Sequence, residues 1–146
     1  MNDLHGSPVP KWFRTVSVLA VLWNLIGCCM WCMEMFAQDV MTEGMTERQQ
    51  EWVRSIPIWI YVVYGIAVLT GTLGSVGLLL RRRWSVSVLA ISFILVVIQM
   101  VYPTFVAGGL EAMGNQSLIM PAIVISLAGV LLRLSIVAKQ RGWFSD

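Results

Sequence analysis

Residues 57–80 read PIWIYVVYGIAVLTGTLGSVGLLL, a run that contains no charged side chain. At about 1.5 Å per residue, an α-helix of this length exceeds the roughly 30 Å of a bilayer's hydrocarbon core. Backbone groups inside lipid must be paired within the segment, and the run lacks the alternation typical of a barrel strand. We therefore predict a transmembrane helix here, with Pro57 at its start.

Composition extends this prediction to the whole chain. Hydrophobic residues make up 58% and charged residues only 12% of the 146 residues, and the mean hydropathy is +0.76, unlike a soluble domain. Four long runs are almost free of charge: residues 15–36, 56–80, 85–106 and 118–138. The sequence predicts an all-α integral membrane protein of one domain, 1–146, with four transmembrane helices. The outer loops would be 37–55 and 107–117, and the first ten residues, MNDLHGSPVP, a leader without structure.

Basic residues predict the orientation, because lysine and arginine near membrane helices favour the cytoplasmic side. With a cytoplasmic N-terminus, only Arg48 and Arg54 lie outside. The others then lie inside: Lys11, Arg14, Arg81, Arg82, Arg83, Arg133, Lys139 and Arg141. We therefore predict that both termini are cytoplasmic.

The two halves of the chain resemble each other weakly. VSVLA at 16–20 recurs at 86–90, Pro57 and Pro121 open the two return helices, and RRRW at 81–84 and QRGW at 140–143 follow their ends. One hypothesis is a pair of helical hairpins related as a parallel repeat, as in some transporters. The alternative is chance similarity between helix starts that share an apolar composition.

Small residues and aromatic residues indicate how the helices pack and where they meet the membrane surfaces. In 57–80 a stripe of small side chains predicts close helix packing: Ala67, Gly71, Gly74, Ser75 and Gly77. Aromatic residues near the ends predict interfacial anchors. They are Trp59, Tyr61 and Tyr64 on the outer side and Trp12, Trp84 and Trp143 on the inner side.

Polar residues inside membrane helices are costly and therefore informative. Asn24 is expected near the bilayer centre and facing another helix, Gln99 nearer the outer side, and Glu34 at the outer headgroup level, where water reaches it. Asn24 and Gln99 are candidates either for hydrogen bonds between helices or for contact with a substrate.

Cysteines cluster in WNLIGCCMWCMEMF, residues 23–36. Helical spacing puts Cys28, Cys32 and Met35 along one stripe with Asn24. The sulfur atoms of the two cysteines and the methionine are soft donors that would suit copper or mercury. The alternatives are that thiols in an apolar setting are inert, or that LIGC at 25–28 is a lipobox with Cys28 as the lipidated residue.

Catalytic and nucleic-acid-binding patterns are missing from the sequence. The single histidine, His5, lies in the leader, and there is no Gly-rich phosphate loop, no Ser/His/Asp set and no carboxylate pair within a helix. RRRW at 81–84 is explained by topology and anionic lipids. We therefore predict no enzymatic activity, no cofactor and no nucleic-acid partner.

Several stretches together resemble a known group of proteins: RTVSVLAVLWNLIG, GTLGSVGLLLRRRW, VVIQM and MPAIVISLAGVLLRLSIVAKQRGW. Over residues 12–144 the chain resembles uncharacterised small four-helix inner-membrane proteins of proteobacteria, some automatically labelled sugar transporter. The resemblance implies the bacterial inner membrane as the location. It implies shared features at Trp23, Asn24, Gly27, Gly71, Gly74, Gly77, Arg81, Trp84, Gln99, Pro121, Lys139, Arg141, Gly142 and Trp143, and none at the cysteines.

Three hypotheses for function follow from the sequence. The leading one is a small transporter-like protein for a small polar solute, with Asn24 and Gln99 at a polar contact between the hairpins. The second is a structural or accessory subunit of a membrane complex, in which the same residues only join helices. The third is soft-metal transport through Cys28 and Cys32. Besides the lipid bilayer, the expected partners are further copies of the chain or another membrane protein.

Overall fold

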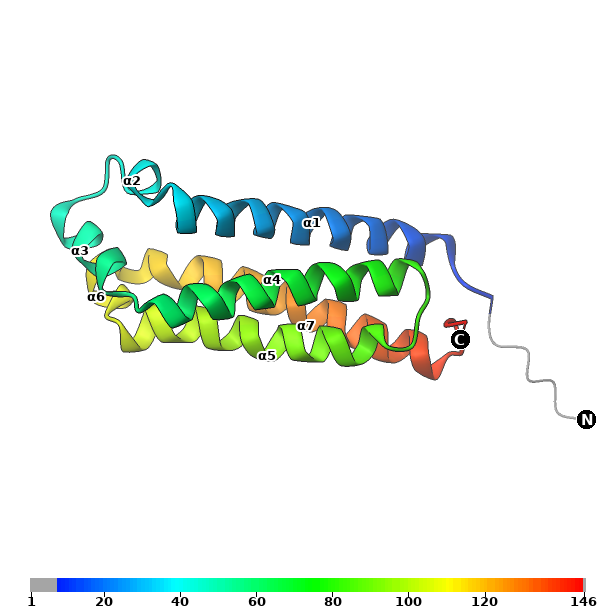
Figure 1. Ribbon diagram of the computed structural model, residues 1–146. Helices are drawn as coiled ribbons and strands as arrows, with labels where there is room; N and C mark the ends of the chain where they lie inside the picture. The colour runs from blue at the N-terminus through cyan, green and yellow to red at the C-terminus, as the bar shows by residue number, and fades with distance from the viewer. Residues whose placement is uncertain (1–7, 146) are drawn as a thin grey trace, which may run out of the picture.

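The computed structural model describes residues 8–145, and within them four long helices run side by side (Figure 1). They are α1 (Lys11–Phe36), α4 (Ile58–Leu79), α5 (Ser85–Val101) and α7 (Ile119–Gln140). Each belongs to a helical span long and apolar enough to cross a membrane, which confirms the predicted all-α fold with four such helices. Helix α1 starts at Lys11, one turn before the predicted boundary, and residues 1–7 of the predicted leader lie outside the described part.

Helix α4 is the central packing element of the bundle. It packs along α1 on one side and along α5 on the other, and α5 packs against α7, whereas α1 and α7 scarcely touch within the described residues. Figure 1 shows α1 set apart from α7, with α4 next to it. The bundle is therefore tightly packed between α1 and α4, between α4 and α5 and between α5 and α7, and loosely packed between α1 and α7.

The small residues of α4 all lie buried at its contacts. The stripe consists of Ala67, Gly71, Gly74, Ser75 and Gly77. A Cβ added at Gly74 would come within 2.7 Å of the Leu89 side chain, and one at Gly77 within 2.7 Å of the Trp84 ring. The absence of side chains at these glycines thus lets α5 and Trp84, the residue that precedes it, approach α4 closely. Close approach of this kind stabilises the packing of membrane helices.

Helices α4 and α7 end with the same hydrogen-bonding pattern. Arg82 N–H donates to Gly77 C=O at 2.8 Å, and Trp143 N–H donates to Ala138 C=O at 2.9 Å, each bridging back over the last turn. The preceding residues, Arg81 and Gly142, have positive φ angles of 56° and 68°. This is the Schellman motif. Its geometry makes Arg81 the structural equivalent of Gly142, whereas an alignment of RRRW with QRGW by sequence would make Arg83 the equivalent of Gly142.

We expect Arg81→Gly to stabilise the protein by about 0.5–1 kcal/mol, because a left-handed φ is strained for arginine and free for glycine. The measurement is the thermal unfolding midpoint in detergent. Arg82→Gly is the matched control, since Arg82 has no positive φ, and it should lower the midpoint. Equal shifts for both variants would contradict this account of the helix end.

The end of the bundle that holds Lys11 and Gln140 is filled by apolar side chains. The cluster, which we call the aromatic plug, consists of Phe13, Leu78, Ala138, Trp143 and Phe144. Ser145 N–H donates to Arg81 C=O at 2.9 Å and holds the last described residues against the α4 end. The prediction that Trp143 is an interfacial anchor was wrong: its side chain is 2% exposed, because the turn after α7 folds it under the bundle.

At the opposite end the predicted outer loops contain helices of their own. Residues 37–55 form α2 (Gln38–Met41) and α3 (Glu47–Ser55), and residues 107–117 contain α6 (Gly109–Met113). A π-helical turn, Tyr102–Val106, extends α5, and a 3-10 turn, Gly114–Leu118, leads into α7. The Thr46 hydroxyl and the Gln49 side chain cap α3 reciprocally, a capping box that the sequence analysis missed. These segments cover this end of the bundle.

Candidate functional site

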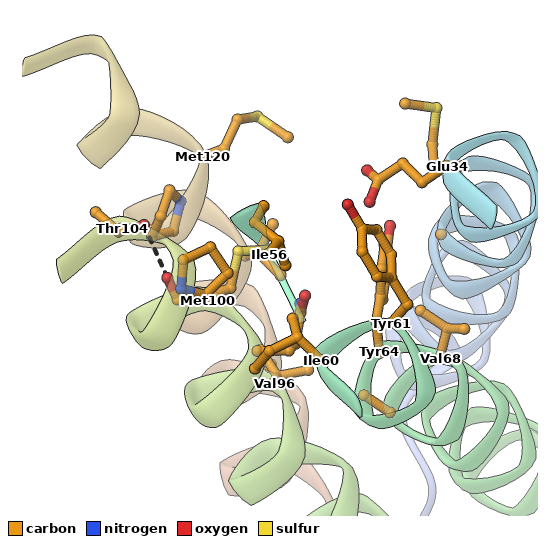
Figure 2. Close-up of a pocket in the computed structure, with 18 of the residues that line it drawn as sticks. Glu34, Ile56, Ile60, Tyr61, Tyr64, Val68, Val96, Met100, Thr104 and Met120 are labelled. Carbon is orange, nitrogen blue, oxygen red and sulfur yellow. Dashed lines mark hydrogen bonds between the residues drawn. The ribbon is translucent and has the colours of Figure 1, made fainter. Parts of the chain in front are cut away.

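A cavity of about 530 Å³ lies between the four long helices, in the half of the bundle away from the aromatic plug. Helix α1 contributes residues from Trp23 to Glu34, and α7 contributes residues from Met120 to Leu131. Figure 2 shows side chains from opposite walls facing the open space, with Glu34 on one side and Met120 on the other. The space exists because α1 and α7 scarcely touch within the described residues, while α4 and α5 pack against each other between them. Small-molecule sites in proteins are typically clefts of about 300–1,000 Å³.

The cavity lining is mainly apolar and unusually rich in methionine. Six of the nine methionines contribute: Met30, Met41, Met45, Met100, Met113 and Met120. Among the described residues that line it, Glu34 is the single charged side chain, and there is no lysine, arginine, histidine or aspartate. Methionine side chains are flexible and polarizable, so they can adapt to ligands of different outline. The chemistry of the lining therefore favours an apolar body with few polar groups.

One corner of the cavity joins Glu34 to two tyrosines of α4. Figure 2 shows the side chains of Tyr61 and Tyr64 extending toward the Glu34 carboxylate. The Tyr61 hydroxyl accepts a hydrogen bond from Gln38 Nε2 at 3.0 Å and lies 3.5 Å from Val53 C=O, which ties it to α2 and α3. Trp31 Nε1 donates to Tyr61 C=O at 2.8 Å and holds α1 against α4 beside this corner.

Gln99 provides a second polar position in the cavity wall. Its side chain is 6% exposed, and no hydrogen-bond partner for its amide is found within residues 8–145. Its neighbour Thr104 is satisfied locally, because its hydroxyl donates to Met100 C=O at 2.8 Å (Figure 2). The Gln99 amide is not among the fully buried polar atoms that lack a partner, so it reaches the cavity surface, where a ligand can donate to it or accept from it.

Asn24, the other polar candidate, is already engaged. Its Nδ2 donates to Ala20 C=O at 2.9 Å and to Ser75 Oγ at 3.1 Å, which joins α1 to α4. Asn24 and Gln99 both line the cavity, yet no hydrogen bond links them among the described residues. The structure thus places Asn24 as a contact within the first hairpin, not between the two hairpins, and the choice between substrate and packing roles stays a prediction.

A tryptophan from α3 covers the cavity next to the π-helical turn. Trp52 Nε1 donates to Pro103 C=O at 3.1 Å. A Cβ added at Gly109 would approach the Pro103 carbonyl to 2.7 Å and the Trp52 ring to 3.0 Å, so glycine allows α6 to close over this contact. π-helical turns are frequent at functional sites. Sequence reasoning missed this cap because Trp52, Pro103 and Gly109 come from three separate segments.

The cysteines are not brought together around the cavity. Cys28 Sγ lies 3.5 Å from Thr72 Oγ1 and faces α4, whereas Cys29 and Cys32 are exposed on α1. Neither Cys28, Cys32 nor Met35 lines the cavity, and residues 8–145 contain no cluster of three or more histidine, cysteine or acidic side chains that could hold a metal ion. The fold therefore does not bring the predicted sulfur donors together around the cavity, as soft-metal transport through it would need.

Three residues that line the cavity were expected elsewhere from the sequence. Glu34 was expected in water at the headgroup level, but it is only partly exposed and lines the cavity. Tyr61 and Tyr64 were expected as interfacial anchors, but Tyr61 is 9% exposed and both line the cavity as well. Helical spacing carried a usable signal, because Tyr61, Tyr64 and Val68 lie on one face of α4.

Comparison with known proteins adds no assignment: no family model, no curated protein and no solved structure matches this chain. The resemblance to small four-helix inner-membrane proteins therefore stays a prediction.

Proposed function

We propose that this protein is a membrane carrier that binds a small molecule with a mainly apolar body between its four long helices. The observation that carries the proposal is the 530 Å³ cavity, which has the size of a ligand site and a lining of thioether, aliphatic and aromatic groups. This chemistry fits an amphipathic molecule better than the small polar solute expected from the sequence. A bacterial inner-membrane location is part of the proposal.

Closure at one end of the bundle supports a carrier over a passive pore. The aromatic plug fills the end that holds Lys11 and Gln140, and the cavity occupies the other half. A carrier that alternates between two sides must be closed on one side while its binding site is reached from the other. With the arginine-rich end in the cytoplasm, the cavity belongs to the outer half of the membrane.

Blocking the cavity tests the proposal. Val124 on α7 lines the cavity, whereas Val130 on the same helix is 61% exposed and does not. We expect Val124→Trp to weaken binding of 2-propylnaphthalene by at least about tenfold and Val130→Trp to leave it unchanged. The assay is equilibrium binding to protein in phosphatidylcholine nanodiscs, with empty nanodiscs subtracted and thermal midpoints measured for both variants. Wild-type affinity in a folded Val124→Trp protein would refute the cavity as a binding site.

Transport is measured separately, as the flux of 2-naphthyl glucoside into proteoliposomes. The apolar body of this neutral probe matches the cavity lining, and its sugar slows passive crossing. A carrier should raise the flux, and Val124→Trp should abolish the increase while Val130→Trp retains it. Cavity-dependent binding without flux would contradict the carrier role and favour the accessory subunit.

A further inference from the structure

The charge in the cavity is carried by Glu34, and nothing in the described chain neutralises it. No lysine, arginine or histidine lines the cavity, and no ion pair to Glu34 is found within residues 8–145. Charged groups at membrane depth are costly and are usually paired with one another or with a ligand. The carboxylate therefore attracts a positive group into a space otherwise lined by neutral side chains.

The surroundings of Glu34 suit an organic cation better than a hydrated metal ion. Tyr61 and Tyr64 place two aromatic rings beside the carboxylate (Figure 2), and aromatic faces attract ammonium groups. Six methionines give an adaptable apolar surface for the remainder of such a ligand. The cavity volume of about 530 Å³ is that of a site for an organic molecule, far larger than a metal ion.

Gln99 supplies an independent indication of a ligand. Its side chain is 6% exposed and lines the cavity, its amide has no hydrogen-bond partner among the described residues, and its carbonyl oxygen can accept from an N–H donor. An ammonium group is both a cation and a set of N–H donors. A ligand with a protonated amine and an apolar body thus matches the charge of Glu34, the rings of the two tyrosines and the accepting oxygen of Gln99.

We propose that the cavity binds hydrophobic organic ammonium ions, with Glu34 of α1 as the counter-charge, the rings of Tyr61 and Tyr64 against the ammonium and the methionines around the apolar body. This inference rests on the proposed function, since it specifies the ligand class of the same cavity.

Three probes with the same naphthalene body isolate the effect of charge. They are 2-(2-naphthyl)ethylammonium, the neutral 2-propylnaphthalene and the anionic 3-(2-naphthyl)propanoate. In nanodiscs of zwitterionic phosphatidylcholine at neutral pH, we expect the ammonium to bind at least about tenfold more tightly than the neutral probe and the anion more weakly than both. Equal affinity for the ammonium and the neutral probe, or a preference for the anion, would overturn the inference.

Glu34→Gln removes the charge while preserving the size of the side chain. We expect it to weaken binding of the ammonium by about tenfold and to leave the neutral probe unchanged. Glu51→Gln is the matched control, because Glu51 is exposed on α3 at the same end of the bundle and does not line the cavity. An equal loss in both variants would reveal surface attraction and refute the role of Glu34.

The neutral probe separates the two proposals. If 2-propylnaphthalene binds in a manner blocked by Val124→Trp while the ammonium gains nothing from Glu34, the cavity is a ligand site and the charge inference fails alone. If no probe binds in a cavity-dependent manner, the proposed function fails and the inference fails with it.

Discussion

Trp143→Ala is expected to lower the free energy of unfolding by about 3–5 kcal/mol, the usual cost of deleting a fully buried aromatic side chain. Trp143 is 2% exposed. Its ring lies 5.3 Å from that of Phe13 and 5.9 Å from that of Trp12, centre to centre, both in edge-to-face arrangements. These contacts join the turn after α7 to the start of α1, the two helices that scarcely meet elsewhere. The loss should therefore loosen the whole end of the bundle.

The measurement is unfolding in mixed micelles by titration with dodecyl sulfate, followed by circular dichroism. Trp12→Ala is the control, because Trp12 takes part in the same ring contacts but is 51% exposed, so its truncation should cost clearly less. Trp143→Phe should fall between wild type and Trp143→Ala, since it keeps an aromatic ring and removes an indole N–H that has no partner among the described residues. Similar losses for Trp143→Ala and Trp12→Ala would show that the aromatic plug does not hold the bundle.

Four transmembrane helices could be predicted because the property that marks them is local. A run such as 57–80 needs only its own composition to indicate a membrane helix. Trp143 shows the limit of this reasoning, since nothing near it distinguishes a ring at the membrane surface from one folded beneath the bundle. Its burial depends on Gly142, whose positive φ turns the chain back toward Phe13.

The cavity could not be predicted for a related reason. Its volume depends on the separation of α1 from α7, which follows from how both helices pack on the central pair. Met30, Met100 and Met120 look unrelated in the sequence, and they face one space only because of the rotation of three different helices. Asn24 and Gln99 were found because polar groups are rare in apolar runs. Glu34 and Tyr61 were not recognised as cavity residues, because a position at the membrane interface explains a glutamate or a tyrosine near a helix end equally well.

Gly71→Ala is expected to lower the free energy of unfolding by about 2–3 kcal/mol through overpacking and loss of a hydrogen bond. A Cβ at this position would overlap the Asn24 amide oxygen and lie 3.0 Å from Ser92 Oγ. Asn24 cannot withdraw freely, because its Nδ2 donates to Ser75 Oγ at 3.1 Å. The added methyl group must therefore displace α1, displace α5 or break the contact between Asn24 and Ser75.

Gly129→Ala on α7 is the matched control. Its Cβ would meet only the Phe93 ring at 3.5 Å, an ordinary contact, so the better helix propensity of alanine should leave the protein as stable or more stable by up to about 1 kcal/mol. Thermal midpoints in detergent compare the two variants. A harmless Gly71→Ala would show that α1 has room to move away from α4.

A double-mutant cycle identifies the origin of the loss. Asn24→Ala alone removes the Ser75 contact, and in its background Gly71→Ala no longer meets an amide oxygen. We expect the double variant to be more stable than the sum of the single losses predicts, by about 1 kcal/mol or more, because the two residues compete for one space. Additive losses would instead assign the cost to Ser92 and α5. Since Asn24 and Gly71 both line the cavity, the same cycle measured on probe binding separates helix packing from ligand contact at Asn24.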